Sequence, residues 1–324
     1  MSLDDPYPDR AAERSRWILE RRGPRAGIDP ARAVGAFVDR ERTETGTIAD
    51  VATILLANHE CPWRCLMCDL WTHTTEETAA PGAIPAQVAG ALAALPSVRR
   101  VKLYNAGSFF DPKAVPREDH AEIAEMLRGF ERVTVECHPA LVGEDCFRFA
   151  RLLGGRLEVA LGLETVHTGI LEKLNKGMTA ESFRRASESL AREGVELRAF
   201  LLVGLPFLPP EDSLAWAGRS LDFAFDCGAT AAVLIPTRAG NGAMDALARR
   251  GDFVPPTLAM VERALADGIA TFAERGRVFA DLWDLERLRD CAACFPARRH
   301  RLERMNLEQR VPPPLTCGDC GAAA

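Results

Sequence analysis

The chain has 324 residues, 47% of them hydrophobic, and a formal net charge of −6. This length can bury a full-sized core and suits one large domain with appendages or two domains. The acidic balance argues against a strongly electrostatic nucleic-acid binder, although a local basic patch can still bind one.

No apolar run approaches the roughly 18 residues that a membrane span needs. The first residues also lack the basic and then apolar start of a signal peptide. We therefore expect a cytoplasmic protein with no membrane contact.

Residues up to about 50 are charged and are predicted to be helical. Apolar residues recur near helical spacing in 11–19 and in 31–38, and two Gly-Pro or Asp-Pro pairs interrupt the pattern. The sequence therefore predicts a helical N-terminal extension, residues 1–48, that packs on the rest of the chain.

From residue 51 onward, short apolar segments alternate with amphipathic helical segments, which is the pattern of a parallel sheet built from crossover units. Six strands are predicted, over residues 51–56, 101–104, 133–136, 157–164, 199–203 and 231–235. Thr179 is a predicted helix N-cap, and Gly194 and Gly228 are predicted helix stops. The pattern fits a partial (β/α)6 barrel or an open doubly wound sheet, and in both folds the residues that follow the strands line the site.

A loop of three cysteines follows the first predicted strand. Cys61, Cys65 and Cys68 are spaced C-x3-C-x2-C, and in a long chain without an export signal the ten cysteines favour metal binding over disulfides. Three thiols on so short a loop can ligate three irons of an iron–sulfur cube and leave the fourth iron open to another ligand. A zinc site and three unrelated buried cysteines remain as alternatives.

Polar residues follow the second, third and fourth strands. Asn105 and Ser108 offer hydrogen-bonding groups beside Gly107, which indicates a ligand contact or a plain tight turn. Glu136 and Glu164 close apolar segments, where a carboxylate is costly to bury unless it is paired or bonded to a ligand. Both are predicted ligand contacts, and the alternative is a carboxylate that caps a neighbouring helix.

Two further residues are candidates for the substrate side of the site. His138 is an acid or base, or else a histidine that is only satisfied by hydrogen bonds. Arg238 lies in a glycine-rich loop after the sixth strand, where it binds an anionic substrate or belongs to a plain turn.

These residues resemble the radical SAM (S-adenosylmethionine) superfamily. The similarity runs from about Val51 to Arg238 and includes the cysteine loop and the segments Gly162–Thr165, Leu174–Thr179 and Val203–Pro206. Those segments resemble the subgroup that contains the Elongator catalytic subunit, the radical subunit of archaeosine synthase and the methylthiotransferases. Within that subgroup the resemblance is greatest to the archaeosine synthase subunit and to uncharacterised bacterial relatives. The acetyltransferase and RNA-binding modules of the Elongator subunit and the methylthiotransferases have no length to fit here, which argues against those activities.

The resemblance implies a partial (β/α)6 radical SAM barrel over residues 49–255, with a 4Fe–4S cluster on the three cysteines and SAM at the open iron. Such a cluster passes one electron to SAM, and the resulting 5′-deoxyadenosyl radical abstracts hydrogen from a substrate. A flavodoxin-type or ferredoxin-type protein is the implied electron donor. The implied SAM contacts are Met67, Asn105, Gly107, Ser108, Glu136, Glu164, Arg198 and Gly204.

Some of these contacts depart from the family pattern or have a simpler explanation. Met67 stands where the family often has an aromatic residue against adenine, and a methionine can still pack on a ring. The glycine-rich motif at Gly107 does not end in the usual glutamate. Arg198 is implied to meet the SAM carboxylate, or else is an exposed arginine beside an acidic neighbour, and Gly204 is implied to leave room for adenine.

A cysteine-rich C-terminal region, residues 256–324, follows the barrel. A helix is predicted over 257–274, and then Cys291 and Cys294 form one C-x2-C pair and Cys317 and Cys320 a second, a strong signal for a four-thiolate metal site. Structural zinc is expected, with an auxiliary iron–sulfur cluster or unligated cysteines as alternatives. The arginines between the pairs grip RNA phosphates or form a solvated loop.

Three functions are consistent with these patterns. The first is a radical SAM enzyme that abstracts hydrogen from a modified tRNA base, as the nearest relatives imply. The second keeps that chemistry but acts on a small metabolite or peptide held by Arg238. The third is a non-catalytic iron–sulfur or zinc protein with a redox or binding role.

Overall fold

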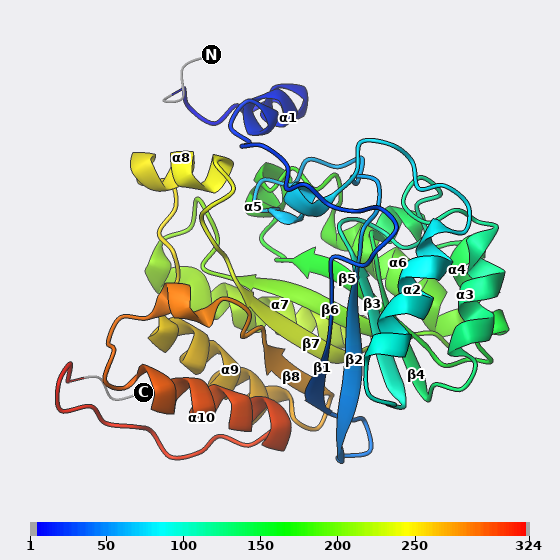
Figure 1. The fold of residues 1–324 in the computed structure, drawn as a ribbon. Coiled ribbons are helices and arrows are strands. Elements are labelled where there is room, and N and C mark those ends of the chain that lie inside the picture. The colour runs from blue at the N-terminus through cyan, green and yellow to red at the C-terminus, as the bar shows by residue number, and fades with distance from the viewer. Residues whose placement is uncertain (1–4, 322–324) are drawn as a thin grey trace.

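The computed structural model describes residues 5–321 and contains one mixed sheet of eight strands, curled into a half-barrel (Figure 1). The strands pair in chain order, with β1 antiparallel to β2 and all the other neighbours parallel. Their bounds are β1 Gly35–Arg42, β2 Ile48–Leu56, β3 Arg100–Asn105, β4 Arg132–Cys137, β5 Leu157–Glu164, β6 Glu196–Val203, β7 Ala229–Pro236 and β8 Arg277–Ala280.

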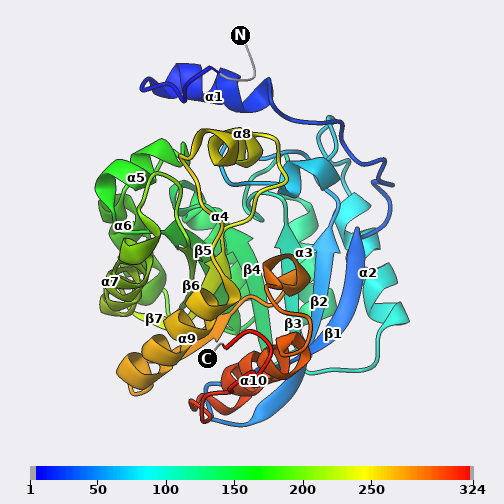
Figure 2. The ribbon, with the colours of Figure 1, turned by 90° about the vertical axis from the view of Figure 1, so that its left-hand side faces the viewer.

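Helices cover the outer face of the sheet and one of its ends (Figures 1 and 2). Their bounds are α1 Ala11–Leu19, α2 Ala83–Ala94, α3 Asp119–Leu127, α4 Glu144–Leu152, α5 Thr168–Lys173, α6 Ala180–Arg192, α7 Ser213–Asp226, α8 Ala243–Arg250, α9 Leu258–Phe272 and α10 Phe295–Glu308. In both views α1 and α8 lie beyond the carboxyl ends of the parallel strands. None of the helices among residues 5–321 is long and apolar enough to cross a bilayer.

Two hydrophobic clusters hold the fold together. The main cluster lies between the sheet and its helices, and its central strand β5 is buried at all eight positions, as expected for a strand of a parallel sheet covered on both faces. A smaller cluster joins α1 and α8 to the cysteine loop through Trp17, Leu66, Met244 and Leu247. The N-terminal helix is therefore part of the structure around that loop.

All six predicted strands are present, each within three residues of its expected start. The Thr179 side chain accepts the backbone N–H of Ser182 at 3.1 Å and caps α6, as predicted. Gly194 and Gly228 follow α6 and α7 in left-handed backbone conformations, with φ of 67° and 84°. Local patterns thus predicted most of the barrel.

The predicted helix over residues 31–38 is wrong, because residues 35–42 form strand β1. A short apolar run such as Ala36-Phe37-Val38 does not distinguish a helix from a strand by periodicity alone. Antiparallel pairing with β2 decides the outcome here. The N-terminal extension is therefore a helix followed by a strand, and it extends the sheet by one member.

Candidate functional site

The three cysteines lie on the loop that follows β2, at the end of the sheet covered by α1 and α8 (Figure 1). Cys61, Cys65 and Cys68 are partly buried, and none forms a disulfide. The pKa of each of the three thiols is raised, and burial is the largest cause. For Cys68 the pKa is raised to about 12. The loop therefore concentrates three thiols in a poorly solvated place, where a metal would stabilise their thiolate forms.

A segment between α5 and α6 holds the first half of this loop. The Leu66 N–H donates to the Leu174 carbonyl at 2.9 Å, and the Asn175 side-chain amide donates to the Arg64 carbonyl at 2.8 Å. Asn175 has a φ of 56°, a left-handed conformation that asparagine tolerates better than most residues. The backbone of the cysteine loop is thus fixed by residues more than a hundred positions further along the chain.

Asn241 holds the second half of the loop. Its side-chain amide donates to the carbonyls of Leu66 at 2.8 Å and Cys68 at 3.1 Å, and its side-chain oxygen accepts the Met244 N–H at the start of α8. The side chain is buried, so each of these bonds replaces a contact with water. Asn241 therefore connects the cysteine loop to the helix that lies across the barrel mouth.

A buried carboxylate ties the N-terminal segment to the same loop. Glu60 lies 2.7 Å from Arg22, 2.7 Å from Arg25 and 3.2 Å from Arg64. Burial alone raises the pKa of Glu60, but the hydrogen bond and the charge of Arg22, with help from the other two arginines, outweigh it and lower the pKa overall. Glu60 is therefore a structural anion beside Cys61.

His138 packs against Trp63 of the cysteine loop. Its ring stacks on Trp63, with centroids 3.6 Å apart, and Trp63 also fills the space beside Gly177, where a Cβ would come within 2.9 Å of the indole ring. Nδ1 accepts the Ala140 N–H at 3.1 Å, and Nε2 donates to the Lys176 carbonyl at 3.0 Å. Burial lowers the pKa of His138 to about 4. Both ring nitrogens are thus occupied, which does not favour the predicted acid or base role.

A lysine that the sequence patterns did not single out lies at the centre of the site. Lys176 forms an ion pair with Glu164 at 2.5 Å, and the side chains of both are almost buried. The pair occupies space left free by Gly162, because a Cβ there would lie 2.1 Å from the Lys176 Nζ. Burial lowers the pKa of Lys176, but the charge and hydrogen bond of Glu164, together with the charges of Cys65 and Cys61, outweigh burial and raise the pKa overall. The predicted ligand carboxylate Glu164 therefore has a protein partner.

Glu136 and Asn105 lie together at the ends of β4 and β3. The Asn105 backbone N–H donates to the Glu136 carboxylate at 3.2 Å, and burial raises the pKa of Glu136 to about 7. The Asn105 side chain is buried, and among residues 5–321 neither its oxygen nor its nitrogen has a hydrogen-bond partner. A buried amide with both groups unsatisfied is rare and marks a place where another molecule can bind.

The other predicted SAM contacts after β3 have structural explanations. Gly107 has a φ of 151°, and a Cβ there would lie 3.0 Å from the Cβ of Cys61, so a larger residue would press on the cysteine loop. The buried Ser108 hydroxyl lies 3.3 Å from the Cys137 sulfur, to which it donates, and accepts the His138 N–H at 3.2 Å. Both residues therefore shape the loop next to the cysteines.

Gly204 and Met67 also lie near the barrel mouth. A Cβ on Gly204 would come within 2.7 Å of the Pro256 ring, so the protein itself requires glycine there, whatever binds in the site. Met67 is partly buried and packs against both hydrophobic clusters. The contact with Pro256 therefore explains the glycine at position 204 without any contact to adenine. Met67 offers a flexible apolar surface at the barrel mouth.

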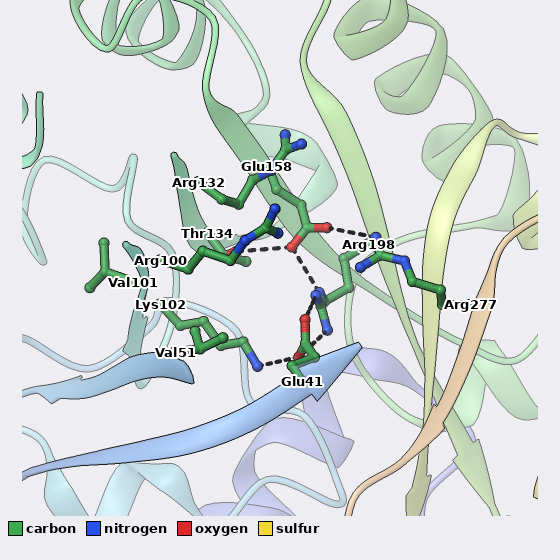
Figure 3. A pocket seen from close by; sticks show the side chains of 10 residues that line it. All are labelled: Glu41, Val51, Arg100, Val101, Lys102, Arg132, Thr134, Glu158, Arg198 and Arg277. Atoms are coloured by element: carbon green, nitrogen blue, oxygen red, sulfur yellow. Dashed lines mark hydrogen bonds and ion pairs between the residues drawn. The ribbon is translucent and has the colours of Figure 1, made fainter. Parts of the chain in front are cut away.

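Arg198 does not lie with the other predicted contacts (Figure 3). Inside the half-barrel it is paired with Glu158 at 2.9 Å and with Glu41 of β1 at 2.6 Å. Lys102 also contacts Glu41, and this network encloses a void of about 10 Å³, room for about one water. Because its charge is satisfied inside the barrel, Arg198 is left out of the proposed cofactor site.

Arg238, predicted to hold an anionic substrate, is paired within the protein. Its guanidinium lies 2.6 Å from the Asp281 carboxylate and donates to the Trp283 carbonyl at 2.6 Å. It joins the loop after β7 to the loop after β8. The structure thus gives it a bridging contact at the open edge of the sheet.

The C-terminal cysteines are close together in space. The sulfur atoms of Cys291, Cys294, Cys317 and Cys320 all lie within 4.8 Å of one another, and those of Cys294 and Cys320 are 3.9 Å apart. The predicted clustering of the two C-x2-C pairs is therefore confirmed. The group can hold a metal ion and would join the chain after α10 to the start of that helix.

No family model matches the chain. An uncharacterised protein of Methanocaldococcus jannaschii is 25% identical to it over 65% of this chain and 60% of that protein. Archaeosine synthase subunit beta of Methanosarcina acetivorans is 29% identical over 54% of this chain and 52% of that protein. The chain spans about half the length of the curated relatives it matches.

The solved structure of methylornithine synthase, a radical SAM enzyme, matches 86% of this chain and 71% of its own chain with a TM-score of 0.50 and 12% identity. This chain has the radical SAM fold. The resemblance found in the sequence, to the superfamily and to the subgroup with the archaeosine synthase subunit, is thereby confirmed.

The residues at the mouth of this radical SAM barrel fit the groups that the fold implies. The three thiols of the C-x3-C-x2-C loop are a donor set for an iron–sulfur cube with one open iron. The unsatisfied amide of Asn105 and the Glu136 carboxyl offer a donor and acceptors for a polar ligand beside them. The donor chemistry of the site therefore suits both a cluster and SAM.

Sequence reasoning missed Asn175, Lys176 and Asn241, which surround the cysteine loop of the radical SAM barrel. The first two lie in the Leu174–Thr179 segment that carried the family resemblance. That segment was the only sequence signal for them. Asn241 lies in a glycine-rich loop that reads as an ordinary turn.

Proposed function

We propose that this protein is a radical SAM enzyme that binds a 4Fe–4S cluster at Cys61, Cys65 and Cys68 and cleaves SAM to abstract hydrogen from its substrate. One observation carries the proposal. The three thiols lie at the carboxyl ends of the parallel strands of a radical SAM fold, where functional sites of barrel folds form. When bound, the cluster supplies the electron that cleaves SAM reductively.

The residues of the chain prepare this site in advance. Asn175 and Asn241 fix the carbonyls of the cysteine loop, so the three thiols keep their relative positions before a cluster binds. Asn105 and Glu136 are the groups that bind the polar end of SAM, and Met67 offers a polarisable surface to its adenine. The helices α1 and α8 exclude water from the mouth of the barrel.

The substrate proposed first is a modified tRNA base. The support comes from two relatives named archaeosine synthase subunit beta, 29% and 28% identical to this chain, although each match covers about half of the relative or less. The name of a subunit also supports a partner protein. The exposed Arg304 on α10 and Arg310 after it would contact phosphates, since nucleic-acid backbones are bound mainly by Arg and Lys.

A small metabolite or peptide is the second candidate. The supporting observation is the small cluster of apolar side chains that joins α1 and α8 over the cysteine loop and narrows the approach from that side. A net charge of −6 supports it too, because it repels a polyanion outside local basic patches. Arg238 is not assigned to this substrate, since Asp281 neutralises it.

We further propose that the C-terminal cysteines hold one zinc ion. Four thiolates around a single tetrahedral zinc, with Zn–S bonds near 2.3 Å, stand about 3.8 Å apart. The 3.9 Å between Cys294 and Cys320 and the limit of 4.8 Å for the whole group match that spacing. Ligands of an iron–sulfur cube bind separate irons and stand further apart, so the geometry favours zinc over an auxiliary cluster.

The proposed function is tested with protein purified without oxygen. We expect about four irons per chain, as one 4Fe–4S cluster requires, and 5′-deoxyadenosine on incubation with SAM and a one-electron reductant. Cys65→Ser removes a proposed ligand and should abolish both, whereas Cys227→Ser, a partly buried cysteine outside both groups, should leave both unchanged. Wild-type protein that binds no iron and forms no 5′-deoxyadenosine overturns the proposal.

The substrate is tested in cells. Mass spectrometry of tRNA nucleosides from cells that lack the protein should show loss of one modified nucleoside if the substrate is a tRNA base. A gel shift with bulk tRNA, measured over a range of salt concentrations, should then show the steep salt dependence of phosphate contacts. An unchanged nucleoside profile would favour the small-substrate candidate.

A further inference from the structure

The segment from Leu174 to Gly177 brings one cation to the cysteine loop. Its two ends are fixed, since the Leu174 carbonyl accepts the Leu66 N–H at 2.9 Å and Gly177 packs under Trp63. Between them the Lys176 carbonyl accepts the His138 Nε2–H at 3.0 Å. The backbone around Lys176 is therefore held by three contacts, two to the cysteine loop at Leu66 and Trp63 and one to His138.

The side chain of Lys176 is fixed as firmly as its backbone. Its ammonium lies 2.5 Å from the Glu164 carboxylate, and only 11% of the lysine side chain and 7% of the glutamate side chain are exposed. Glu164 itself has a φ of 65°, an uncommon conformation for a residue other than glycine. Such a conformation persists only where the surroundings impose it, and here it directs Glu164 at the ammonium in the space that Gly162 leaves free.

The charges around the cysteines are mostly negative. A bound metal would convert three thiols to thiolates, and Glu136 and Glu164 add two carboxyl groups to the same region. Among the charged groups with the largest effects on Cys65, Lys176 is the cation, and it also acts on Cys61 and Glu136. Lys176 is thus a buried positive charge that, together with Arg64 beside Cys61, partly balances this group of anions.

We propose that Lys176, oriented by Glu164, is an electrostatic positioning residue that raises the reduction potential of the cluster at Cys61, Cys65 and Cys68. This inference rests on the proposed function. Reduction adds one negative charge to a cluster, so a fixed cation nearby stabilises the reduced form, and cluster potentials depend on such local charge. Glu164 partly neutralises the ammonium, which makes the rise in potential smaller. It also holds the ammonium in one position relative to the cysteines.

The test compares three variants as cluster-loaded full chains. Lys176→Met removes the charge and keeps a long apolar side chain, Lys176→Arg keeps the charge, and Glu164→Gln leaves the ammonium without its counter-charge. The midpoint potential of each is measured by anaerobic redox titration followed by electron paramagnetic resonance. Iron per chain and the visible absorption of the cluster are recorded on the same samples.

Relative to wild type, Lys176→Met should make reduction about tenfold less favourable, a lowering of about 59 mV for a one-electron couple. Lys176→Arg should stay near the wild-type value, and Glu164→Gln should shift the potential upward. A wild-type potential in Lys176→Met with full iron content overturns the inference while the proposed function stands. Absence of iron from the wild type overturns the proposed function instead.

A second variant covers the case in which Lys176→Met does not load, because Glu164 would then be a buried charge without a partner. The double variant Lys176→Met with Glu164→Gln leaves two neutral groups in the same space. Its potential should still lie below the wild-type value, because the lysine acts on Cys65 more strongly than the glutamate does. If the double variant also loads no iron while Lys176→Arg does, Lys176 serves cluster assembly and the inference is wrong.

Discussion

Glu136 is an ionisable residue whose charge near neutral pH depends on its surroundings. Burial raises the pKa of its carboxyl to about 7, against a partial lowering by the Asn105 N–H and by Lys176. At pH values between its unfolded pKa near 4.5 and about 7, the folded protein therefore binds a proton that the unfolded chain has lost. Its contribution to stability is full below pH 4.5 and falls as pH rises through 7.

We expect Glu136→Gln to remove this loss, because glutamine keeps an acceptor for the Asn105 N–H and carries no charge. The variant should match the wild type near pH 4.5 and gain relative stability up to pH 8, by at most about 3 kcal/mol for a shift of this size. Urea unfolding of both proteins at several pH values, under one reductant, measures the difference. Parallel stability profiles across the whole range would contradict the raised pKa.

Residue spacing predicts groups that are close along the chain. The three cysteines of the loop and the two C-x2-C pairs were identified by spacing alone, because ligands of one metal site usually come in short motifs. Asn175 and Asn241 were not, since the carbonyls they bind lie 111 and 175 residues away. Arg198 was predicted to meet the SAM carboxylate, because the sequence does not show that Glu41 and Glu158 lie inside the barrel beside it.

At the scale of elements, the loops around the barrel mouth depend on asparagine side chains that bridge backbone groups. Asn241→Ala removes two donors to the cysteine loop and one cap of α8, which should lower the unfolding free energy by about 1–3 kcal/mol. It should also lower the iron retained after purification. The loss of iron is expected because the carbonyls of Leu66 and Cys68 lose their shared donor, so the backbone next to a proposed iron ligand is no longer fixed.

Asn306→Ala is the matched control for this prediction. Asn306 on α10 bridges the N–H and carbonyl of Ala280 at 2.8 Å each, the same kind of contact at a strand far from the cysteine loop in sequence. It should cost similar stability, measured by thermal unfolding, and leave the iron content unchanged. Equal iron loss in both variants would mean that general destabilisation, and not the position of the loop, controls cluster retention.

Helix α1 covers the site, and Trp17 is its largest fully buried side chain. Trp17 is fully buried, donates its indole N–H to the Asp5 carbonyl at 3.0 Å and stacks under Arg21. Trp17→Ala should cost about 3–5 kcal/mol in the packing of this region. Residues 5–26 should become sensitive to protease, and the cluster absorption should decay faster in air.

The control for this prediction is Trp283→Ala. Trp283 is 59% exposed and packs mainly on Phe37, so its loss should leave both the protease pattern near α1 and the decay rate unchanged. A Trp17→Ala protein whose cluster decays at the wild-type rate would show that α1 does not protect the site. Comparison of the two variants thus distinguishes the loss of the cover that α1 provides from the general effect of removing a large aromatic side chain.

Elements with a strong local pattern were predicted well, and those set by tertiary pairing were not. Strand β5 was predicted to the residue, because a fully buried strand is a continuous apolar run between turn residues. Strand β8 has only four residues and was not recognised. Strand β1 was taken for a helix, since its assignment depends on pairing with β2 and on Glu41 meeting Lys102 inside the barrel.

For the whole molecule, the sequence predicted the fold class but not how the two ends of the chain are used. The family resemblance implied the partial barrel, and the crossover pattern supported it independently. The position of the N-terminal helix over the barrel mouth arises from contacts between Trp17, Leu66 and Met244, which no local pattern links. The charged interior of the half-barrel, with Arg198 between two glutamates, likewise forms only when strands β1, β5 and β6 come together (Figure 3).

Arg298 links the start of α10, beside the four C-terminal cysteines, to α9. Arg298 on α10 is 1% exposed and lies 2.6 Å from Glu262 of α9 and 3.0 Å from Asp290, next to Cys291. An ion bound at Cys294 and its partners would hold this helix start in place. Removing the ion should therefore loosen α10 and residues 309–321 first, because structural metal sites contribute their binding energy to folding.

We expect Cys294→Ser with Cys320→Ser to abolish one equivalent of zinc, to lower the unfolding temperature and to open residues 309–321 to protease. The iron at the cysteine loop should not change, because that loop is held by Asn175 and Asn241 and not by α10. Metal analysis by mass spectrometry on the purified variant and on Cys227→Ser measures both metals at once. A variant that loses iron in place of zinc would identify an auxiliary cluster, and one that loses neither would show that the four thiols bind no metal.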